Sequence, residues 1–396
     1  MCAKYKLRSS VFHFYDILLS MRKNKILTGV FALSLFCGCA DRVPEEKTEE
    51  PEKYTNISVD AGFDTVFQLI EFGYDHDQMD SYFRICTDMF RNCNDQFDIY
   101  NDYEGLYNLK TINDNAGIAP VKVSSDIIDM LKEAKSFHEI SDGAFDITIG
   151  SLLKVWHEYR DAGIELNAEG KNAPVPGDEE LKEAAVYSGW DKVVINEEDS
   201  TVYITDPHVS LDVGGIAKGY AAEMIGRYME DADVICTTVN AGRNIRTVGT
   251  KPDGSDWVIG IADPADGSSI YCTVTMKGSG SFVTSGDYER YYTGEDGKKY
   301  HHIIDPKTLK PADYYHSVSI ITPDSSAADC LSTTLFTLSI EDGKKVLEAY
   351  TEKTGNSAEA VWIMDSDRTQ NEEGHDSGDY YCVCTDGIRD LITFAR

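Results

Sequence analysis

A carboxylate and a hydroxyl lie one helical turn apart in the segment "DCLSTT", residues 329–334. If this segment is a helix, Asp329 and Thr333 share one of its faces. Together they form part of an oxygen ligand set for Mg²⁺ or another hard cation, completed by water, a substrate phosphate and a backbone carbonyl. The alternative is ordinary helix chemistry, in which Asp329 favours the helix dipole and Thr333 bonds back to the preceding turn. These two residues alone leave both interpretations open.

The glycine-containing segment "DVGGIAKGYAAE", residues 212–223, is a second place where a ligand can approach the backbone. Its glycine pair predicts a turn between a strand that ends at Asp212 and a helix that begins near Ala217. The free N–H groups of a helix start can bind a phosphate, and Lys218 adds a positive charge. The segment is neither G-x-G-x-x-G nor a P-loop, so a plain strand-to-helix turn remains the alternative.

Two further segments place polar side chains beside turns. In "FDITIG", residues 145–150, Asp146 and Thr148 alternate with apolar residues, which predicts a strand whose polar face meets either a ligand or solvent. In "TSGDYERYY", residues 284–292, the first three residues predict a tight polar turn that presents N–H and O–H donors, or a simple hairpin turn.

The run "HHIIDP", residues 301–306, contains two adjacent histidines. On a strand they point to opposite sides, so one of them at most faces a given pocket. Histidine titrates near neutral pH and therefore suits proton transfer, although a single histidine is also a common structural residue. Asp305 and Pro306 predict the end of the strand.

The composition is that of an ordinary globular protein with a large negative charge. The formal net charge of −31 and the lack of a basic run in the body of the chain argue against a nucleic-acid surface. A phosphate-bearing ligand would need a metal ion or oriented N–H groups to offset the repulsion.

The N-terminal residues predict export and a lipid anchor. A basic stretch from Met21, a short apolar run and Gly38-Cys39 resemble a bacterial lipoprotein signal, with Cys39 as the lipidated residue. We expect residues 1–39 to be an N-terminal extension and signal peptide, and residues 40–54 to be a flexible tether. The protein would then be extracytoplasmic and anchored to the membrane. An uncleaved N-terminal anchor is the alternative, and the true start, Met1 or Met21, stays open.

Hydrophobic periodicity predicts an α+β fold with mainly antiparallel sheets and packed helices, in one body over residues 55–396. We expect a polar surface loop at residues 165–180. The expected helices are 79–93, 124–143, 217–231, 327–339 and 341–355. The expected strands are 63–73, 191–199, 200–213, 231–239, 255–264, 269–278, 316–324, 358–367, 379–387 and 390–396.

Taken together, the motifs resemble a known family. The strings "FDITIG", "LDVGGIAKGY", "VNAGRNI", "TSGDYERYY", "YHHIIDPKT" and "ADCLSTTLF" occur in the order and approximate spacing of the ApbE family of FAD:protein FMN transferases. The resemblance covers nearly all of the chain from Phe63 and implies a single T-fold-related body. The chain departs from it at Gly242-Arg243-Asn244, where the family often has Gly-Gly-Asn or Gly-Gly-Asp, and at Asp64-Thr65, where it often has Gly-Thr.

The resemblance implies an extracytoplasmic enzyme that binds FAD and Mg²⁺. Such enzymes move FMN from FAD to a Thr or Ser hydroxyl of a target flavoprotein and release AMP; the acceptor is a protein such as a subunit of a membrane redox complex. Some members instead hydrolyse FAD to FMN and AMP. A metal-dependent FAD pyrophosphatase and a non-catalytic flavin-binding lipoprotein are therefore the alternatives, and no nucleic-acid partner is expected.

The resemblance also assigns site residues by motif position. Asp329 and Thr333 would be side-chain metal ligands, and Ala217 would contribute its backbone carbonyl. His302 would be the base near the acceptor hydroxyl, with Asp305 orienting or replacing it. The FAD site would include Phe63, Tyr100, Asp146, Ile147, Thr148, Gly214, Lys218, Tyr220, Ser285, His302 and Ile303.

Overall fold

Alternating burial along the strands builds one large antiparallel sheet. The computed structural model describes residues 50–232 and 234–395, and the expected signal peptide, with Cys39, lies outside them. Nine strands pair in the order β1-β2-β6-β7-β10-β15-β16-β18-β17, and every pair is antiparallel. Their bounds are β1 Glu52–Ser58, β2 Phe67–Gly73, β6 Cys236–Ala241, β7 Asn244–Gly249, β10 Gly280–Gly286, β15 Ser317–Thr322, β16 Glu359–Asp365, β17 His375–Asp376 and β18 Tyr380–Cys384.

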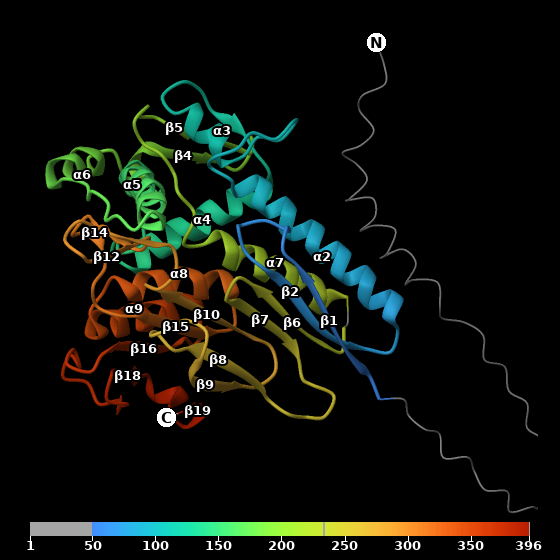
Figure 1. The fold of residues 1–396 in the computed structure, drawn as a ribbon. Coiled ribbons are helices and arrows are strands. Elements are labelled where there is room, and N and C mark those ends of the chain that lie inside the picture. The colour runs from blue at the N-terminus through green and yellow to red at the C-terminus, as the bar shows by residue number, and fades with distance from the viewer. Residues whose placement is uncertain (1–49, 233, 396) are drawn as a thin grey trace, which may run out of the picture. The chain divides into compact units, whose positions relative to one another are not determined.

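Helices cover one face of this sheet (Figure 1). Helix α7 lies on β6 and β7, α8 on β10 and β15, and α2 beside α7, and they share one core with the facing side chains of the strands. The helices are α2 His76–Phe97, α3 Leu109–Asp114, α4 Ser125–Ile140, α5 Gly150–Ala168, α6 Asp178–Ala185, α7 Ala217–Asp231, α8 Ser325–Phe336 and α9 Ile340–Thr354, with 3₁₀ turns η1 Trp190–Lys192 and η2 Asp386–Leu391.

The opposite face of the sheet carries a second apolar cluster. There β8 Trp257–Ala262, β9 Ile270–Met276 and β19 Ile392–Phe394 form a three-stranded sheet whose inner side chains pack on Phe282, Val361 and Ile363. The remaining strands form small sheets: β3 Val121–Lys122 with β4 Val193–Asn196 and β5 Thr201–Ile204, β11 Tyr291–Thr293 with β12 Lys299–His301, and β13 Ile304–Asp305 with β14 Lys310–Pro311. The predicted α+β class with mainly antiparallel sheets is confirmed.

The strand expected at 200–213 is shorter, since β5 ends at Ile204. Four further local expectations are corrected. Residues 145–149 form turns that lead into α5 rather than a strand, because the Asp146 carboxylate accepts hydrogen bonds from Thr148 instead of leaving the backbone free to pair. The loop expected at 165–180 is shorter, since α5 continues to Ala168 and α6 begins at Asp178. Strand β1 begins at Glu52, inside the expected tether, and pairs with β2.

The fourth correction concerns the segment "TSG" at residues 284–286. Its residues belong to strand β10, where Thr284 pairs with Ser319 and Ser285 with Val318, so the turn starts only after Gly286. Among the helices of the described residues, none combines the length and the apolar character that a membrane crossing requires.

Candidate active site

The first turn of α7 and the N-terminal half of α8 meet at a direct hydrogen bond. The backbone amide of Gly219 donates to Oδ2 of Asp329 at 2.9 Å, and Asp329 is buried. This approach requires a glycine, because a Cβ at position 219 would lie 2.4 Å from the carbonyl oxygen of Ser325 and 2.5 Å from Cβ of Asp329. The glycine-containing motif and the "DCLSTT" motif, distant in sequence, therefore share one site.

Thr333 lies one turn further along α8 and faces the same motif. A Cβ at Gly215 would lie 3.3 Å from Oγ1 of Thr333, so this glycine leaves the hydroxyl accessible to the turn before α7. Among the described residues the Thr333 hydroxyl makes no hydrogen bond, unlike Thr334, which bonds back to Cys330. Ala217 is the first residue of α7 and is buried at this junction.

These groups fit a hard cation better than a soft one. Within residues 50–232 and 234–395, no cluster of three or more His, Cys, Asp or Glu side chains is arranged to hold a metal. Asp329 uses Oδ2 for the Gly219 amide and leaves Oδ1 without a donor in this part of the chain. One free carboxylate oxygen, one unbonded hydroxyl and nearby backbone form an all-oxygen set, which Mg²⁺ prefers and completes with water or phosphate.

A lysine and two serines surround Asp329. Nζ of Lys218 lies 3.8 Å from Oδ2 of Asp329 and 3.5 Å from the carbonyl oxygen of Gly214. Oγ of Ser285 lies 2.8 Å from Oγ of Ser332, whose hydroxyl donates to the carbonyl of Asp329 at 3.0 Å. Lys218, Gly214 and Ser285 thus lie beside the expected metal ligands.

The "FDITIG" segment lies against the glycine motif through backbone contacts. The amide of Asp212 donates to the carbonyl of Ile147 at 2.9 Å, and the amide of Gly150 donates to the carbonyl of Ser210 at 3.0 Å. The Thr148 hydroxyl donates to Asp146 at 2.7 Å and accepts from the amide of Gly189 at 2.8 Å, which fixes the loop. Although its strand prediction is wrong, the segment lies beside the motif with which it was grouped.

The two adjacent histidines have different environments, but they do not share the expected strand, since His301 ends β12 and His302 lies in the bend before β13. His301 is buried, and its Nε2 lies 2.8 Å from the carbonyl oxygen of Ala312 while its Nδ1 accepts from the amide of Ile303. His302 has a buried Nδ1 that makes no hydrogen bond to any described residue. His301 therefore fixes the hairpin, and His302 carries the free imidazole nitrogen.

Burial and positive charge keep His302 neutral. Burial lowers its pKa well below the usual value, and the charges of His301, Arg290, Lys218 and Arg160 lower it further. A neutral imidazole with an unbonded ring nitrogen can accept a proton. These cations come from different elements, Lys218 from α7, Arg160 from α5 and Arg290 from the loop after β10.

No hydrogen bond or ion pair joins Asp305 to His302 among the described residues. Oδ1 of Asp305 accepts from the amide of Lys307 at 2.8 Å and so stabilises the turn after the hairpin. Asp305 also lines a cavity of about 860 Å³, together with His301, Tyr314, His316 and Arg368. The described bond of Asp305 thus lies within the hairpin turn, and its role beside His302 stays a prediction.

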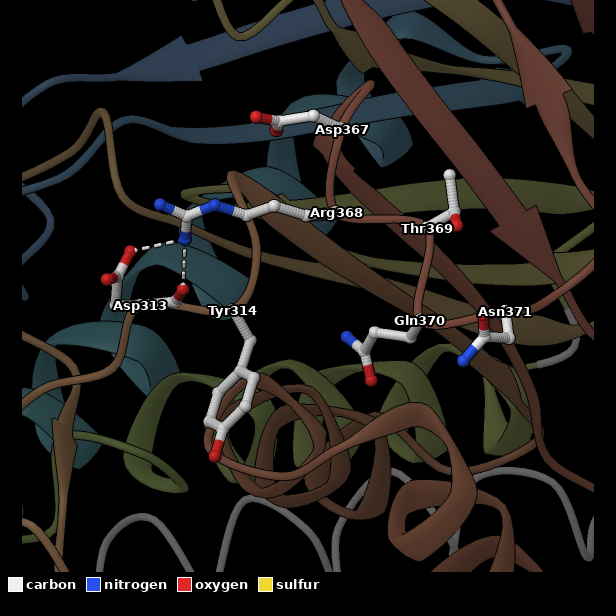
Figure 2. A pocket seen from close by; sticks show the side chains of 7 residues that line it. All are labelled: Asp313, Tyr314, Asp367, Arg368, Thr369, Gln370 and Asn371. Atoms are coloured by element: carbon white, nitrogen blue, oxygen red, sulfur yellow. Dashed lines mark hydrogen bonds and ion pairs between the residues drawn. The ribbon is translucent and has the colours of Figure 1, made fainter.

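A smaller cavity of about 460 Å³ adjoins the first (Figure 2). Arg368 reaches across it to both the carboxylate and the carbonyl oxygen of Asp313, each at 2.6 Å. Its lining residues are Asp313, Tyr314, Asp367, Arg368, Thr369, Gln370 and Asn371. None of the predicted site residues lines this cavity, and Arg368 is already paired within it.

Phe63 and Tyr100, the two expected FAD-site residues nearest the N-terminus, lie near other residues of the site. The carbonyl of Phe63 accepts from Arg290 at 3.4 Å, and the Phe63 amide donates to Asn94 at 2.6 Å. Tyr100 is 62% exposed on the loop after α2. Partial desolvation of its hydroxyl raises its pKa to about 12, with Asp212 adding to the increase and Arg160 opposing it. Phe63 and Tyr100 therefore share charged neighbours with the other site residues.

Two residues differ from expectation in their surroundings. Tyr220 packs edge-on against Phe97 of α2, with ring centroids 5.7 Å apart, and burial beside the acidic residues of α4 raises its pKa. Its described ring contact is thus with the core, not with the other site residues. Arg243, the departure from the family pattern, pairs with Glu289 at 2.9 Å and lies over the ring of Tyr288.

Sequence reasoning missed three residues of this region: His157, Asp212 as a side chain, and Arg290. Nδ1 of His157 lies 2.9 Å from the Tyr100 hydroxyl, and its Nε2 lies 3.8 Å from Oδ2 of Asp212. His157 is on α5, whose start lacks a side-chain cap and gave no helix signal. The only sequence signal was its place seven residues after "FDITIG".

Comparison with known proteins gives a consistent result. The model of the ApbE family matches residues 63–356. A protein of Klebsiella pneumoniae (strain 342) named FAD:protein FMN transferase is 34% identical over 234 residues, which are 59% of this chain and 68% of that protein. A Treponema pallidum protein of the same name is 32% identical over 280 residues, 67% of this chain and 73% of that protein.

Solved structures show the same fold. The ApbE protein of Thermotoga maritima superposes with a TM-score of 0.66 and 31% identity, covering 78% of this chain and 94% of its own. The flavin transferase ApbE from Vibrio cholerae gives a TM-score of 0.67 at 23% identity, covering 86% of this chain and 99% of its own.

Proposed function

The chain belongs to the ApbE family, and from that premise we propose that it is a Mg²⁺-dependent FAD:protein FMN transferase that releases AMP. Its acceptor is a Thr or Ser hydroxyl of a target flavoprotein. The observation that carries the proposal is the hydrogen bond between Gly219 and Asp329, which joins the glycine motif to the carboxylate of "DCLSTT".

The reaction is a substitution at the FMN-side phosphorus of FAD. The acceptor oxygen forms a bond to this phosphorus, and the bond to the bridging oxygen of the diphosphate breaks. The products are an FMN phosphoester on the protein and AMP, and the hydroxyl proton passes to a base or to water. Positioning and charge stabilisation are the main requirements of such a transfer.

Asp329, Thr333 and the carbonyl of Ala217 would hold the Mg²⁺ ion. When bound there, the ion supplies positive charge to the phosphate oxygens. The support for this assignment is the all-oxygen donor set and the unbonded Thr333 hydroxyl described above. Oxygen ligands are also the kind that Mg²⁺ takes when a substrate phosphate completes its coordination.

The chain's own cations act beside this set. A diphosphate approaching a protein of net charge −31 is repelled at long range, so local positive charge matters. Lys218 comes from α7 and Arg290 from the loop after β10, and both lower the pKa of His302 electrostatically. They are therefore placed to attract the diphosphate into the same region.

His302 is the proposed proton acceptor for the attacking hydroxyl. Its Nδ1 is buried and unbonded among the described residues, and its lowered pKa keeps it neutral. General-base catalysis typically contributes about 10²- to 10⁴-fold, and the lower end is expected here because dissociative phosphoryl transfer needs little help from a base.

We also propose that the protein is lipid-anchored through Cys39 on the extracytoplasmic side of the membrane. The support is the sequence of residues 21–39, a basic stretch followed by an apolar run and Gly38-Cys39. Labelling cells with a radioactive or alkynyl fatty acid would test this proposal. A Cys39→Ser variant that is still labelled would contradict it.

An assay of AMP release and covalent flavin tests the enzymatic proposal. Purified protein, FAD, Mg²⁺ and an acceptor flavoprotein domain should yield AMP and a fluorescent, covalently labelled acceptor in equal amounts. Asp329→Ala should abolish both products. AMP with free FMN and no labelled acceptor would instead identify an FAD pyrophosphatase, and neither product would leave only flavin binding.

A further inference from the structure

The Tyr100 side chain is exposed and nevertheless held in one orientation. The residue is 62% exposed, and its hydroxyl lies 2.9 Å from Nδ1 of His157. Its backbone amide donates to Oδ1 of Asp98 at 2.6 Å, and Asp98 also accepts from Asn101 and Tyr103. A surface tyrosine fixed both at its backbone and at its hydroxyl is a preorganised contact surface rather than a freely rotating side chain.

A carboxylate lies near the other ring nitrogen of His157. Its Nε2 faces Oδ2 of Asp212 at 3.8 Å, and the other oxygen of Asp212 accepts from the amide of Gly214 at 2.9 Å. In the tautomer with its proton on Nε2, toward the Asp212 carboxylate, Nδ1 accepts the hydroxyl proton of Tyr100. Burial lowers the pKa of His157, with Asp212 opposing and Arg160 reinforcing this effect, which agrees with a neutral ring.

The arrangement is continuous with the expected metal ligands. Asp212 binds the Gly214 amide, the Gly214 carbonyl lies 3.5 Å from Nζ of Lys218, and Lys218 lies 3.8 Å from Asp329. Arg290 and Arg160 act electrostatically on His157 and on His302 alike. Tyr100 therefore stands at the outer end of the same site.

We propose that His157, oriented by Asp212, is a positioning residue that fixes the Tyr100 ring against the flavin end of FAD before FAD binds. This inference rests on the proposed function, because it takes FAD as the ligand. The expected effect is on affinity. An aromatic side chain that is already ordered loses less conformational entropy when FAD binds. Chemistry at the distant diphosphate should be unaffected.

Binding of FAD in the presence of EDTA tests the proposal without turnover. A phenol ring stacked on the flavin quenches its fluorescence, so a titration reports both affinity and contact. His157→Phe should raise the Kd for FAD about three- to tenfold and weaken the quenching. His157→Asn keeps an acceptor near the position of Nδ1 and should stay within about twofold of wild type, which separates loss of the hydrogen bond from loss of packing.

A second variant and a control complete the test. Tyr100→Phe removes only the hydroxyl, so it should match His157→Phe, and the double variant should be no worse than either one. His208 is a matched control, because it also stacks on a tyrosine, Tyr187, and pairs with an aspartate, Asp206, but is exposed elsewhere. His208→Phe should leave the Kd unchanged.

In turnover, His157→Phe should raise KM for FAD by the same factor and leave kcat within about twofold. Additive effects of His157→Phe and Tyr100→Phe, or an unchanged Kd in His157→Phe, would overturn the inference while the proposed function stands. Absence of FAD binding to the wild-type protein would overturn both.

Discussion

The carboxylate of Asp329 and the backbone amide of Gly219 form a 2.9 Å hydrogen bond across the junction of α8 and α7. Two motifs separated by more than a hundred residues are thus joined atom to atom. The bond fixes one oxygen of Asp329 and leaves the other available, so the position of the expected metal ligand depends on how closely the two helices approach.

A side chain at position 219 should force α7 and α8 apart, and so lower both the stability of the protein and the activity of the site. In Gly219→Ala the new Cβ would meet the carbonyl of Ser325 at 2.4 Å, and the helices must move apart. Overpacking of this kind costs about 1–3 kcal/mol, so urea unfolding should show a lower midpoint, with AMP release reduced further than stability alone explains. Gly177→Ala, at a glycine with open space around it, is the control. Unchanged stability in Gly219→Ala would contradict this packing.

Thr333 should matter for metal binding rather than for folding. Thr333→Val keeps the shape and removes the unbonded hydroxyl, so the Mg²⁺ concentration for half-maximal AMP release should rise by roughly tenfold or more, the effect expected when a metal ligand or its support is lost. Thr333→Ser should restore most of the affinity. Thermal unfolding with and without Mg²⁺ gives a second measurement, because a bound ion stabilises only the folded state. Equal Mg²⁺ dependence in Thr333→Val and wild type would remove Thr333 from the metal site.

A buried ion network supports the same two helices from behind. Glu223 of α7 accepts from Nε of Arg246 at 3.0 Å and from the amide of Ser325, the first residue of α8, at 2.9 Å. Glu223→Ala leaves the buried Arg246 without this partner and should cost about 3–5 kcal/mol. The exposed pair of Lys345 and Glu341 provides the contrast, since Glu341→Ala should change stability by less than about 1 kcal/mol. Similar losses in the two variants would contradict the account.

Glu71 should make stability fall as pH rises. It is buried on β2, neither of its carboxylate oxygens has a partner among the described residues, and burial, with Asp80, raises its pKa from 4.5 to about 8. Between these values the unfolded chain is ionised and the native chain is not, so unfolding releases a proton and its free energy falls by at most about 1.4 kcal/mol per pH unit. In Glu71→Gln this part of the pH dependence should disappear.

Urea unfolding at pH 5 and pH 8 measures this difference. The stability of Glu71→Gln relative to wild type should be greater at pH 8 than at pH 5. Glu348→Gln, at an exposed glutamate of α9, should follow the wild-type pH dependence. If the Gln variant at position 71 and wild type keep the same stability difference at both pH values, Glu71 is not held protonated.

The rate should not depend on a histidine of ordinary pKa. His302 is neutral well below its usual titration range because of burial and nearby positive charge. AMP release by wild type at saturating FAD should therefore be flat from about pH 6 to pH 8, without the loss near pH 6.5 that an unperturbed histidine base gives. His302→Gln should lower kcat at every pH in this range. A rate that follows a pKa near 6.5, absent in His302→Gln, would contradict the buried, neutral state.

Hydrophobic periodicity was sufficient to predict the helices whose apolar face is complete within one segment of the sequence. The helix expected at 217–231 matches α7 at both ends, and the hydrophobic spacing from 79 to 93 lies within α2. The helical spacing of their apolar residues is visible in the sequence. The same kind of spacing placed Asp329 and Thr333 on one helix, which is α8. The order and type of these elements therefore followed from periodicity alone.

Elements that depend on distant partners were not predictable in this way. Strand β1 has a charged, tether-like sequence and becomes a strand only by pairing with β2. The alternation in "FDITIG" resembles a strand, but the Asp146 side chain bonds Thr148 and turns the chain. The contact of His157 with Tyr100 joins residues 57 positions apart, and no local sequence pattern predicts it.

Intact-mass spectrometry of an acceptor domain incubated with this protein, FAD and Mg²⁺ distinguishes FMN transfer from flavin binding alone. The account predicts that the acceptor gains the mass of one FMN less one water, on a Thr or Ser residue, and that Asp329→Ala gives no gain. An acceptor of unchanged mass while wild-type protein binds FAD, or an equal gain with Asp329→Ala, would contradict it.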